Sequence, residues 1–410
     1  MGEFSFVPFG SLAAAARGAF AMGPFGSKIT KENYTTVGVP VVRGVNLAKG
    51  IFVDEEFVYI SHEKADDLAS ANVQPGDLIF THRGTIGQVS MIPRNPRFSR
   101  YVIGSSQVKS RLDESRGCPE FYYYWFKSQY GKSSILAHAS TVGVPGISTP
   151  LTSIKGLNVP YPPFGEQRAI AEVLGALDHK IALNEGIRNT CLSLAAACYE
   201  DAEKGSASEV LGDLAKLFDG PHATPQKTPT GPWFLSISSL KKGYLDLAES
   251  AHLSEGDFPR WTRRVQPQGG DVLFSYETRL GDAALMPPEV RGGLGRRMAL
   301  LRSKTPSVSG TLLLHAYLAP SFQEEIKRRT IHGATVDRLP LKEMPGWRIR
   351  LPVVGERERL SAELDALHAT VMQTANENRT LADLRDTLLP QLVTGKLRVK
   401  DATRVVEGAV

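Results

Sequence analysis

The chain contains the same long helical pattern twice, the second copy 190 residues after the first. One copy follows Gly165-Glu166-Gln167-Arg168, and the other follows Gly355-Glu356-Arg357-Glu358. In each copy apolar residues alternate at steps of four and three, which is typical of a helix that buries one seam against a second helix. The seam positions correspond as follows: Ile170 with Leu360, Leu174 with Leu364, Leu177 with Leu367, and Ile181 with Val371. The two helices are therefore predicted to pack as a coiled coil.

One polar position interrupts both seams, because Asn184 in the first copy corresponds to Thr374 in the second. A polar residue at a single seam position fixes the register of a coiled coil. Beyond it the apolar pattern resumes in both copies, where Cys191, Leu194 and Cys198 correspond to Leu381, Leu384 and Leu388.

The segments before the two helices repeat as well. Gly76-Asp77-Leu78-Ile79-Phe80 matches Gly270-Asp271-Val272-Leu273-Phe274, 194 residues later. At the same offset, Ser140-Thr141-Val142 matches Ala334-Thr335-Val336. Solenoid units span roughly 20–50 residues, so this period is too long for one. Two tandem domains, each followed by one long helix, are expected instead.

The predicted fold class is α+β, with two mixed α/β domains and two long helices. The expected boundaries are a first domain at 1–163, a first helix region at 164–205, a second domain at 206–353, a second helix region at 354–400 and a frayed tail at 401–410. The long helices themselves are predicted from about Glu166 to Glu203 and from about Glu356 to Leu389, before Pro390. Shorter elements are predicted as helices over 119–130 and 312–328 and as strands over 39–42, 77–80, 233–237 and 271–275.

Composition leaves the class of partner open. The formal net charge of +5 permits an anionic partner and equally fits a solvated surface. Three cysteines are too few for a disulfide framework, and no metal-ligand spacing is present. No apolar stretch has the length of a membrane span, and Met1-Gly2-Glu3-Phe4 lacks the basic start of a secretory signal. A cytoplasmic protein is expected.

Several fragments imitate catalytic motifs without completing one. Gly131-Lys132-Ser133 resembles the end of a phosphate-binding loop, but Phe126 stands where that loop needs its first glycine. Asn158-Val159-Pro160-Tyr161 has a valine inside the Asn-Pro-Pro-Tyr pattern of amino-methyltransferases. Glu325-Ile326-Lys327 has nuclease-like spacing but lies on a predicted helix. No nucleophile, base and orienting group are assembled, so we expect no active site, no metal and no cofactor bound by this chain.

The remaining functional signal is recognition of nucleic acid. Polar and basic loops follow the paired Gly-Asp strands, at residues 81–85 and 275–279. Arginine suits bidentate contact with guanine, and arginine or lysine also suits contact with phosphate. The candidate DNA-binding residues are Arg43, His82, Arg83, Thr85, His222, Lys227, Tyr276, Arg279, Arg296 and Arg297. The glycines Gly84, Gly87 and Gly281 are expected only to shape turns, and a solvated surface remains the alternative for the charges.

The sequence resembles the specificity (S) subunits of type I restriction-modification systems. Several motifs carry the resemblance over nearly the whole chain. The central conserved region of the family resembles Pro162-Pro163-Phe164-Gly165-Glu166-Gln167-Arg168-Ala169-Ile170 together with Leu174-Gly175-Ala176-Leu177-Asp178. The distal conserved region resembles Leu384-Arg385-Asp386-Thr387-Leu388-Leu389-Pro390 together with Gly395-Lys396-Leu397. The openings of the family's target recognition domains resemble Gly23-Pro24-Phe25-Gly26-Ser27 and Asp219-Gly220-Pro221-His222-Ala223-Thr224-Pro225. An element near the close of such a domain resembles Ser140-Thr141-Val142-Gly143.

The resemblance implies a non-catalytic DNA-recognition subunit. Each target recognition domain would read one half of a split double-stranded DNA site, and the antiparallel helices would act as a ruler. Two modification subunits would dock on the helices and adjacent domain surfaces and supply S-adenosylmethionine and base flipping. A motor subunit would add ATP- and Mg-dependent cleavage. The second region departs from the family pattern, because Val353-Val354-Gly355-Glu356-Arg357-Glu358 replaces the usual proline and glutamine. That departure puts equal docking at the two ends in doubt.

Two other functions remain alternatives. The first is a diverged DNA methyltransferase or nuclease, which binding of S-adenosylmethionine by the isolated chain would support. The second is a scaffold whose twin domains bind proteins, which salt-insensitive assembly without affinity for DNA would support.

Overall fold

The computed structural model describes residues 4–26, 28–50, 52–140 and 143–409. Residues Met1-Gly2-Glu3, Ser27 and Thr141-Val142 of the sequence motifs lie outside the described residues. The chain forms two compact units, a first unit of Met1–His179 with Leu381–Val410 and a second unit of Lys180–Thr380. Each unit combines one globular domain with part of both long helices, α5 (Phe164–Glu203) and α10 (Val354–Val393).

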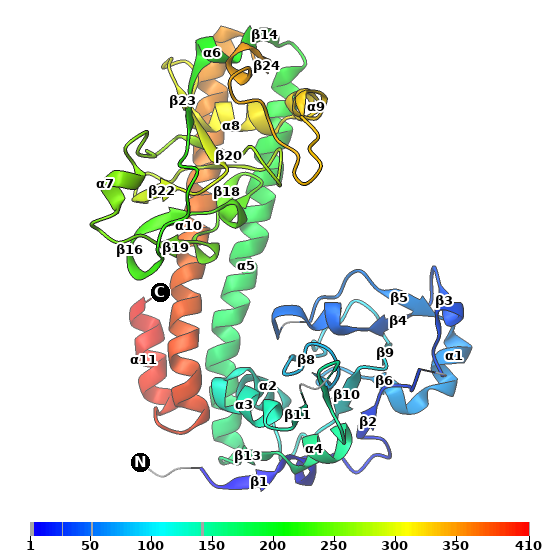
Figure 1. Cartoon of the computed structure of the whole chain (residues 1–410). Coiled ribbons are helices and arrows are strands. Elements are labelled where there is room, and N and C mark those ends of the chain that lie inside the picture. The colour runs from blue at the N-terminus through cyan, green and yellow to red at the C-terminus, as the bar shows by residue number, and fades with distance from the viewer. Residues whose placement is uncertain (1–3, 27, 51, 141–142, 410) are drawn as a thin grey trace. The chain divides into compact units, whose positions relative to one another are not determined.

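The two long helices run in opposite directions. In the first unit, Arg385 near the end of α10 donates from Nη1 to Oδ1 of Asp178 on the first half of α5, at 2.7 Å. In the second unit, Leu360 near the start of α10 shares a hydrophobic core with Tyr199 near the end of α5. Figure 1 shows the helices side by side, α5 in green and α10 in orange. The antiparallel pair that the resemblance implied is therefore confirmed.

The predicted seam positions lie at this helix pair with different burial. Ile170, Leu174, Leu177, Leu360, Leu364 and Val371 are at most 2% exposed, and Ile181 and Leu367 are partly buried. Leu194, expected in the seam, is instead 50% exposed, whereas Ala195 and Tyr199 are buried. The reason is that α5 packs against the second domain as well as against α10 at this level, which turns a different face inward.

Of the two polar residues that interrupt the seam, only Asn184 on α5 forms side-chain hydrogen bonds to the other helix. Asn184 is 1% exposed, and its amide Nδ2 donates to Oε2 of Glu377 and to Oδ1 of Asn378, both at 2.9 Å. Thr374 is also buried, but its hydroxyl donates within its own helix to the carbonyl of Thr370 at 2.9 Å. The hydrogen bonds of Asn184 therefore fix the register between α5 and α10.

The first domain is built from two main sheets and short helices. One sheet has the order β2 (Phe20–Met22), β10 (Gln107–Ser110), β7 (Leu78–Thr81), β8 (Val89–Met91). The other has the order β3 (Tyr34–Thr35), β5 (Val58–Ile60), β4 (Val39–Val42), β9 (Tyr101–Ile103), β6 (Asn72–Val73). Two short pairs are β1 (Phe6–Pro8) with β13 (Asn158–Pro160) and β11 (Ala139–Ser140) with β12 (Gly146–Ile147). The helices are α1 (His62–Asp67), α2 (Pro119–Lys127), α3 (Gln129–Leu136) and α4 (Pro150–Gly156).

The second domain follows the same plan. One sheet has the order β15 (Ala215–Asp219), β23 (Met298–Ser303), β20 (Val272–Ser275), β21 (Ala283–Leu285), and the other has the order β19 (Ala251–His252), β16 (Thr228–Leu235), β22 (Gly292–Leu294). The short pairs are β14 (Ala207–Val210) with β24 (Arg348–Leu351) and β17 (Leu240–Lys241) with β18 (Tyr244–Leu245). The helices are α6 (Leu211–Leu214), α7 (Phe258–Trp261), α8 (Gly310–Leu318) and α9 (Pro320–Arg329).

The strand pairings show that the two domains are copies of one topology. β4 and β9 pair in parallel in the first domain, as β16 and β22 do in the second, although most other pairs are antiparallel. In both domains a strand near the start pairs with a strand near the end, β1 with β13 and β14 with β24. The domain duplication expected from the sequence is thus reproduced in the four-stranded sheet, the parallel pair and the terminal pair, whereas the second sheet has five strands in the first domain and three in the second.

The repeated Gly-Asp motif forms the same buried ion pair in each domain. Arg111, directly after β10, donates from Nε and Nη2 to the two carboxylate oxygens of Asp77, at 2.8 and 2.7 Å. Arg302 on β23 makes the same two contacts with Asp271, also at 2.8 and 2.7 Å. Each carboxylate also accepts a backbone N–H three residues earlier, which holds the turn before the strand. The glycines Gly76 and Gly270 adopt φ of +85° and +86°, which a side chain would oppose.

Arg357 stands where the family pattern has glutamine, and it makes a contact equivalent to that of Gln167 on the first helix. Gln167 is buried at the start of α5 and donates from Nε2 to the carbonyl of Pro162 at 3.0 Å. Arg357, its counterpart on α10, donates from Nε to the carbonyl of Pro352 at 2.8 Å and forms an ion pair with Glu209. Both side chains therefore tie the last strand of a domain to the helix that follows it.

Several predicted boundaries differ from the structure. The helix expected over 119–130 ends at Lys127 and α3 begins at Gln129, because Ser128 between them has an extended backbone. The strand expected over 233–237 is β16, which begins at Thr228 and ends at Leu235. The helix expected over 312–328 is broken into α8 and α9 at Pro320, because proline removes a backbone donor and suits the first turn of a new helix. Pro390 does not end α10 but lies in its last turn. The tail expected to fray forms α11 (Val399–Ala409), where Ala402 is fully buried.

Candidate nucleic-acid interface

In each domain, strand order brings two loops together at one edge of the four-stranded sheet. In the first domain the loop after β7 meets the loop before β10, and the backbone N–H of His82 donates to the carbonyl of Ser106 at 3.0 Å. In the second domain the N–H of Tyr276 donates to the carbonyl of Arg297 at 3.1 Å. In the second domain this contact joins two loops that both carry candidate residues, those of Tyr276 and Arg297.

A third loop, which contains the Gly-Pro motif, joins each pair. The N–H of Gly23 donates to the carbonyl of Gln107 at 2.8 Å, and that of Gly220 donates to the carbonyl of Met298 at 3.0 Å. A Cβ on Gly23 would lie 1.8 Å from the carbonyl oxygen of Gly104, and one on Gly220 would lie 2.6 Å from that of Met298. Only glycine allows such close approach, so the motif brings the Gly-Pro loop onto the interface.

In the first domain the candidate side chains differ in how freely they could contact a ligand. Arg83 and Thr85 are exposed, and Arg83 has no side-chain partner within the described ranges. Arg43 is partly buried and donates from Nη2 to the carbonyl of Glu56 at 3.2 Å. His82 is 8% exposed, and its Nε2 lies 3.2 Å from the carbonyl oxygen of Ser105. Burial lowers the pKa of His82, so it orders the loop as a neutral side chain rather than offering a charge.

In the second domain three candidates lie together. Nε2 of His222 lies 2.9 Å from Oδ2 of Asp219, and its Nδ1 lies 3.3 Å from the hydroxyl of Tyr276. Burial and then the Asp219 carboxylate raise the pKa of the Tyr276 phenol, which therefore stays protonated. Arg297 lies at the other side of this loop and contacts the Glu277 carboxylate at 2.7 Å.

The other three second-domain candidates have different surroundings. Arg296 and Lys227 are exposed, and neither has a side-chain partner in the described part of the chain. Arg279 contacts Asp282 at 2.5 Å and donates from Nη2 to the carbonyl of Leu240 at 3.2 Å. Arg279 is thus held by its own domain, whereas Arg296 and Lys227 are available to a ligand.

Sequence reasoning did not nominate Arg264, which belongs to this surface. Its Nη1 donates to the carbonyl of Gly220 at 2.9 Å and lies 3.4 Å from Oδ2 of Asp219. The run Arg260, Arg263 and Arg264 was a visible signal, but only the fold places it against the Gly-Pro loop.

The backbone of the second interface is strained at two non-glycine residues. Thr278 and Arg297 both adopt φ of +71°, and Nη1 of Arg297 lies 3.4 Å from the Thr278 hydroxyl. The residue that corresponds to Thr278 in the first domain is Gly84, with φ of +88°. Left-handed backbone at non-glycine residues is costly and is often retained at functional loops. The exposed Arg296 directly precedes one of these two residues.

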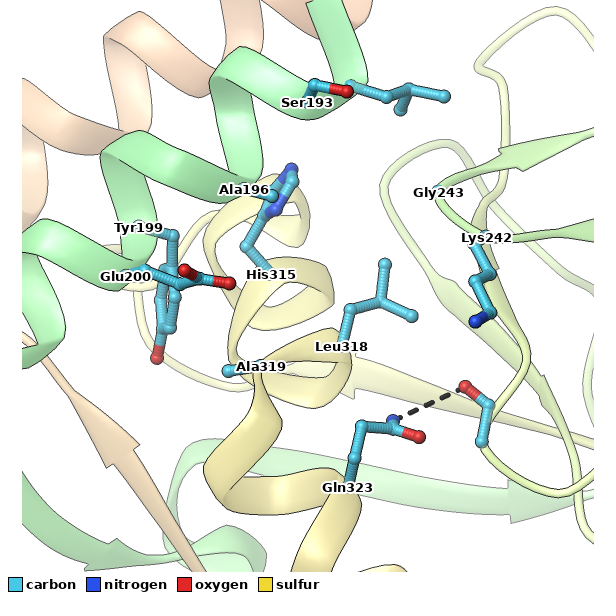
Figure 2. Close-up of a pocket in the computed structure, with 12 residues that line it drawn as sticks. Ser193, Ala196, Tyr199, Glu200, Lys242, Gly243, His315, Leu318, Ala319 and Gln323 are labelled. Carbon is cyan, nitrogen blue, oxygen red and sulfur yellow. Dashed lines mark hydrogen bonds between the residues drawn. The ribbon is translucent and has the colours of Figure 1, made fainter. Parts of the chain in front are cut away.

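The second unit also contains a cavity of about 290 Å³ between the end of α5 and α8 (Figure 2). Tyr199, Glu200, Lys242, His315 and Gln323 line it together with apolar side chains. The lining groups do not form a chain of nucleophile, base and orienting group. Among the described residues, no cluster of three or more potential metal ligands is present, and no helix is long and apolar enough to cross a membrane.

Comparison with known proteins shows which proteins the chain is similar to. Residues 25–191 match the family model described as type I restriction modification DNA specificity domain. The chain is 21% identical to the putative type I restriction enzyme MjaX specificity subunit of Methanocaldococcus jannaschii, over 90% of both proteins. It is 22% identical to the MjaIX specificity subunit of the same organism, over 84% of this chain and 85% of the relative.

A solved structure has the same fold. The S subunit of a type I restriction-modification system from M. genitalium superimposes with a TM-score of 0.59, over 95% of this chain and 96% of that one. The two sequences are 16% identical, so this likeness concerns the architecture.

Proposed function

We infer that this chain, which belongs to the family of type I restriction-modification DNA specificity subunits, reads a split double-stranded DNA site with its two domains. The observation that carries the proposal is the repeated interface, in which the same three loops converge in each domain. Two copies of one recognition surface are suited to two half-sites. As a specificity subunit, the chain works in a complex with other subunits.

The charges at the interface support a division between phosphate and base contacts. Arg83, Lys227 and Arg296 are exposed cations without an internal partner, which suits binding to phosphates. His222 and Arg297 are already oriented by carboxylates of their own domain, and oriented donors suit the reading of base edges.

The helices provide a suitable spacer. A continuous helix of 40 residues is about 60 Å long at 1.5 Å per residue, which exceeds one turn of DNA, about 34 Å. We assign to the antiparallel pair the role of setting the number of base pairs between the half-sites. The buried contact of Asn184 across the pair supports this role, because it opposes slippage of one helix along the other.

The chemistry is assigned to partner subunits. Two modification subunits would bind the helix pair and adjacent domain faces and would supply S-adenosylmethionine and the flipped-base reaction. A motor subunit would supply ATP- and Mg-dependent cleavage. The equivalent roles of Gln167 and Arg357 support docking at both ends, since each ties its domain to the neighbouring helix.

The Arg296→Ala variant tests the phosphate contacts. In complex with modification subunits, it is expected to bind DNA with roughly 3- to 10-fold lower affinity, and the slope of log affinity against log salt should fall by about one. Titrations of a labelled duplex at several salt concentrations measure both quantities. Lys204→Ala is the matched control, because Lys204 is an exposed cation directly after α5, outside the interface. Equal salt slopes for Arg296→Ala and the wild type would remove Arg296 from the interface.

A further inference from the structure

We propose that Phe25 packs its ring against the bases of the first half-site, as a nonpolar DNA contact among the cations of the first domain. This inference rests on the proposed function and extends it. It assigns a base contact to a residue that carries no charge or hydrogen-bonding group.

Phe25 follows the Gly-Pro motif and is exposed to solvent. Phe25 is 67% exposed, more than any other phenylalanine, tyrosine or tryptophan among the described residues. The N–H of Lys28 donates to the carbonyl of Phe25 at 2.7 Å, so the Phe25 backbone is fixed by a hydrogen bond. A large apolar side chain held out of the core in this way loses burial free energy unless a ligand covers it.

The duplicated domain provides an independent observation. Gly23 and Gly220 make equivalent backbone bonds to the first residue of β10 and of β23. Phe25 and His222 each stand two residues after that glycine. A flat ring thus occupies the same exposed position of the interface in both domains, as a phenyl group in one and an imidazole in the other.

The surroundings of Phe25 favour DNA over a protein partner. A Cβ on Gly23 would lie 3.3 Å from Cα of Ser105, whose carbonyl contacts His82, so the Gly-Pro loop adjoins the loop of Arg83. Lys28 and Arg83 are exposed cations with no ion-pair partner in the described ranges. Protein interfaces surround an aromatic anchor with further apolar residues, whereas DNA offers apolar base surfaces beside phosphates.

Two geometries share this chemistry. The ring can contact a thymine methyl group in the major groove, or it can insert at a base step. Both remove apolar surface from water without releasing counterions. Loss of the ring should therefore reduce the affinity for DNA without changing its salt dependence. Loss of a phosphate contact would change both.

The experiment uses the chain in complex with its modification subunits and a duplex carrying the methylated site of the wild-type complex. Phe25→Ala is expected to lower affinity about 5- to 150-fold, the range for loss of one base–aromatic contact, with an unchanged salt slope. Phe25→Trp should keep most of the affinity. Lys28→Ala should reduce the slope by about one. Phe6→Ala is the matched control, because Phe6 is an exposed aromatic residue on β1 of the same domain, and its affinity should stay within about twofold.

Each outcome decides between the two proposals. If the wild-type complex binds the duplex and Phe25→Ala binds equally well, the inference about Phe25 is wrong and the proposed function stands. If Phe25→Ala loses affinity together with salt slope, the residue acts on the phosphate contacts and the inference is again wrong. If the wild-type complex does not bind the duplex, both proposals are overturned.

Discussion

Asp271→Ala is expected to lower the unfolding free energy of the second unit by about 3 kcal/mol. The Asp271 carboxylate is 2% exposed, holds Arg302 through two hydrogen bonds and accepts the N–H of Gln268. Its removal leaves a guanidinium without its counter-charge and a buried turn without its acceptor. Asp271→Asn should lose less, because an amide oxygen can still accept from the Gln268 N–H.

Urea unfolding monitored by tryptophan fluorescence measures this effect. Trp233, Trp261 and Trp347 belong to the second unit and Trp125 to the first, so a Trp125→Phe background reports the second unit alone. The matched control is Glu255→Ala, which breaks the exposed ion pair with Arg291 and should cost below about 1 kcal/mol. Equal losses for Asp271→Ala and Glu255→Ala would show that the buried pair does not stabilise the domain.

Acid is expected to destabilise the second unit through a buried histidine pair. His315 on α8 and His368 on α10 lie with their Nε2 atoms 2.9 Å apart, so one imidazole donates and the other accepts. Burial lowers the pKa of His315 to about 3, with a further contribution from His368. Burial also lowers the pKa of His368 to about 4, although Asp365 opposes this shift. Both rings are therefore neutral in the folded chain above about pH 4.

The sign of the effect follows from proton uptake. In the unfolded chain a histidine binds a proton near pH 6.5, whereas the folded pair does not bind until about pH 4. The pair's contribution to stability is thus fully present above pH 6.5 and is lost as the pH falls from 6.5 toward 4. Each histidine contributes a slope of up to about 1.4 kcal/mol per pH unit in that window.

The His368→Gln variant tests this linkage. It removes one titrating group and leaves His315 without a second imidazole beside it, so the loss of stability between pH 6.5 and pH 4 should be about half that of the wild type. Unfolding free energies of the second unit measured across the window give the slope. His62→Gln is the control, because His62 lies on α1 of the first unit and does not contribute to this transition. An unchanged slope in His368→Gln would contradict the assignment.

The helix pair could be predicted from sequence because its pattern is local and repeated. Residues three and four apart on a helix share one face, so the apolar steps identified α5 and α10 and the buried Asn184. The heptad pattern places Leu194 in the seam, but a heptad pattern describes only one partner and α5 contacts two elements at that level. The pattern predicts that the helix stops before Pro390, because it does not show that a proline can be accommodated in the last helical turn.

The candidate site was predictable in residue type but not in orientation. The duplicated Gly-Asp strands located the loops, and the motif around Gly220 located His222. Side-chain partners depend on strand order, which the sequence does not display. Arg279 is therefore held by Asp282 and the Leu240 carbonyl, while Arg264, from a distant segment, reaches the Gly-Pro loop.

The most direct test of the account is a map of adenine methylation in cells that express this chain with its modification subunit. We expect a split motif with a fixed spacer, and exchange of residues 206–353 for those of another specificity subunit should change one half of the motif and leave the other half and the spacer unchanged. A single continuous motif, or an exchange that alters both halves, would contradict the claim that each domain reads its own half-site.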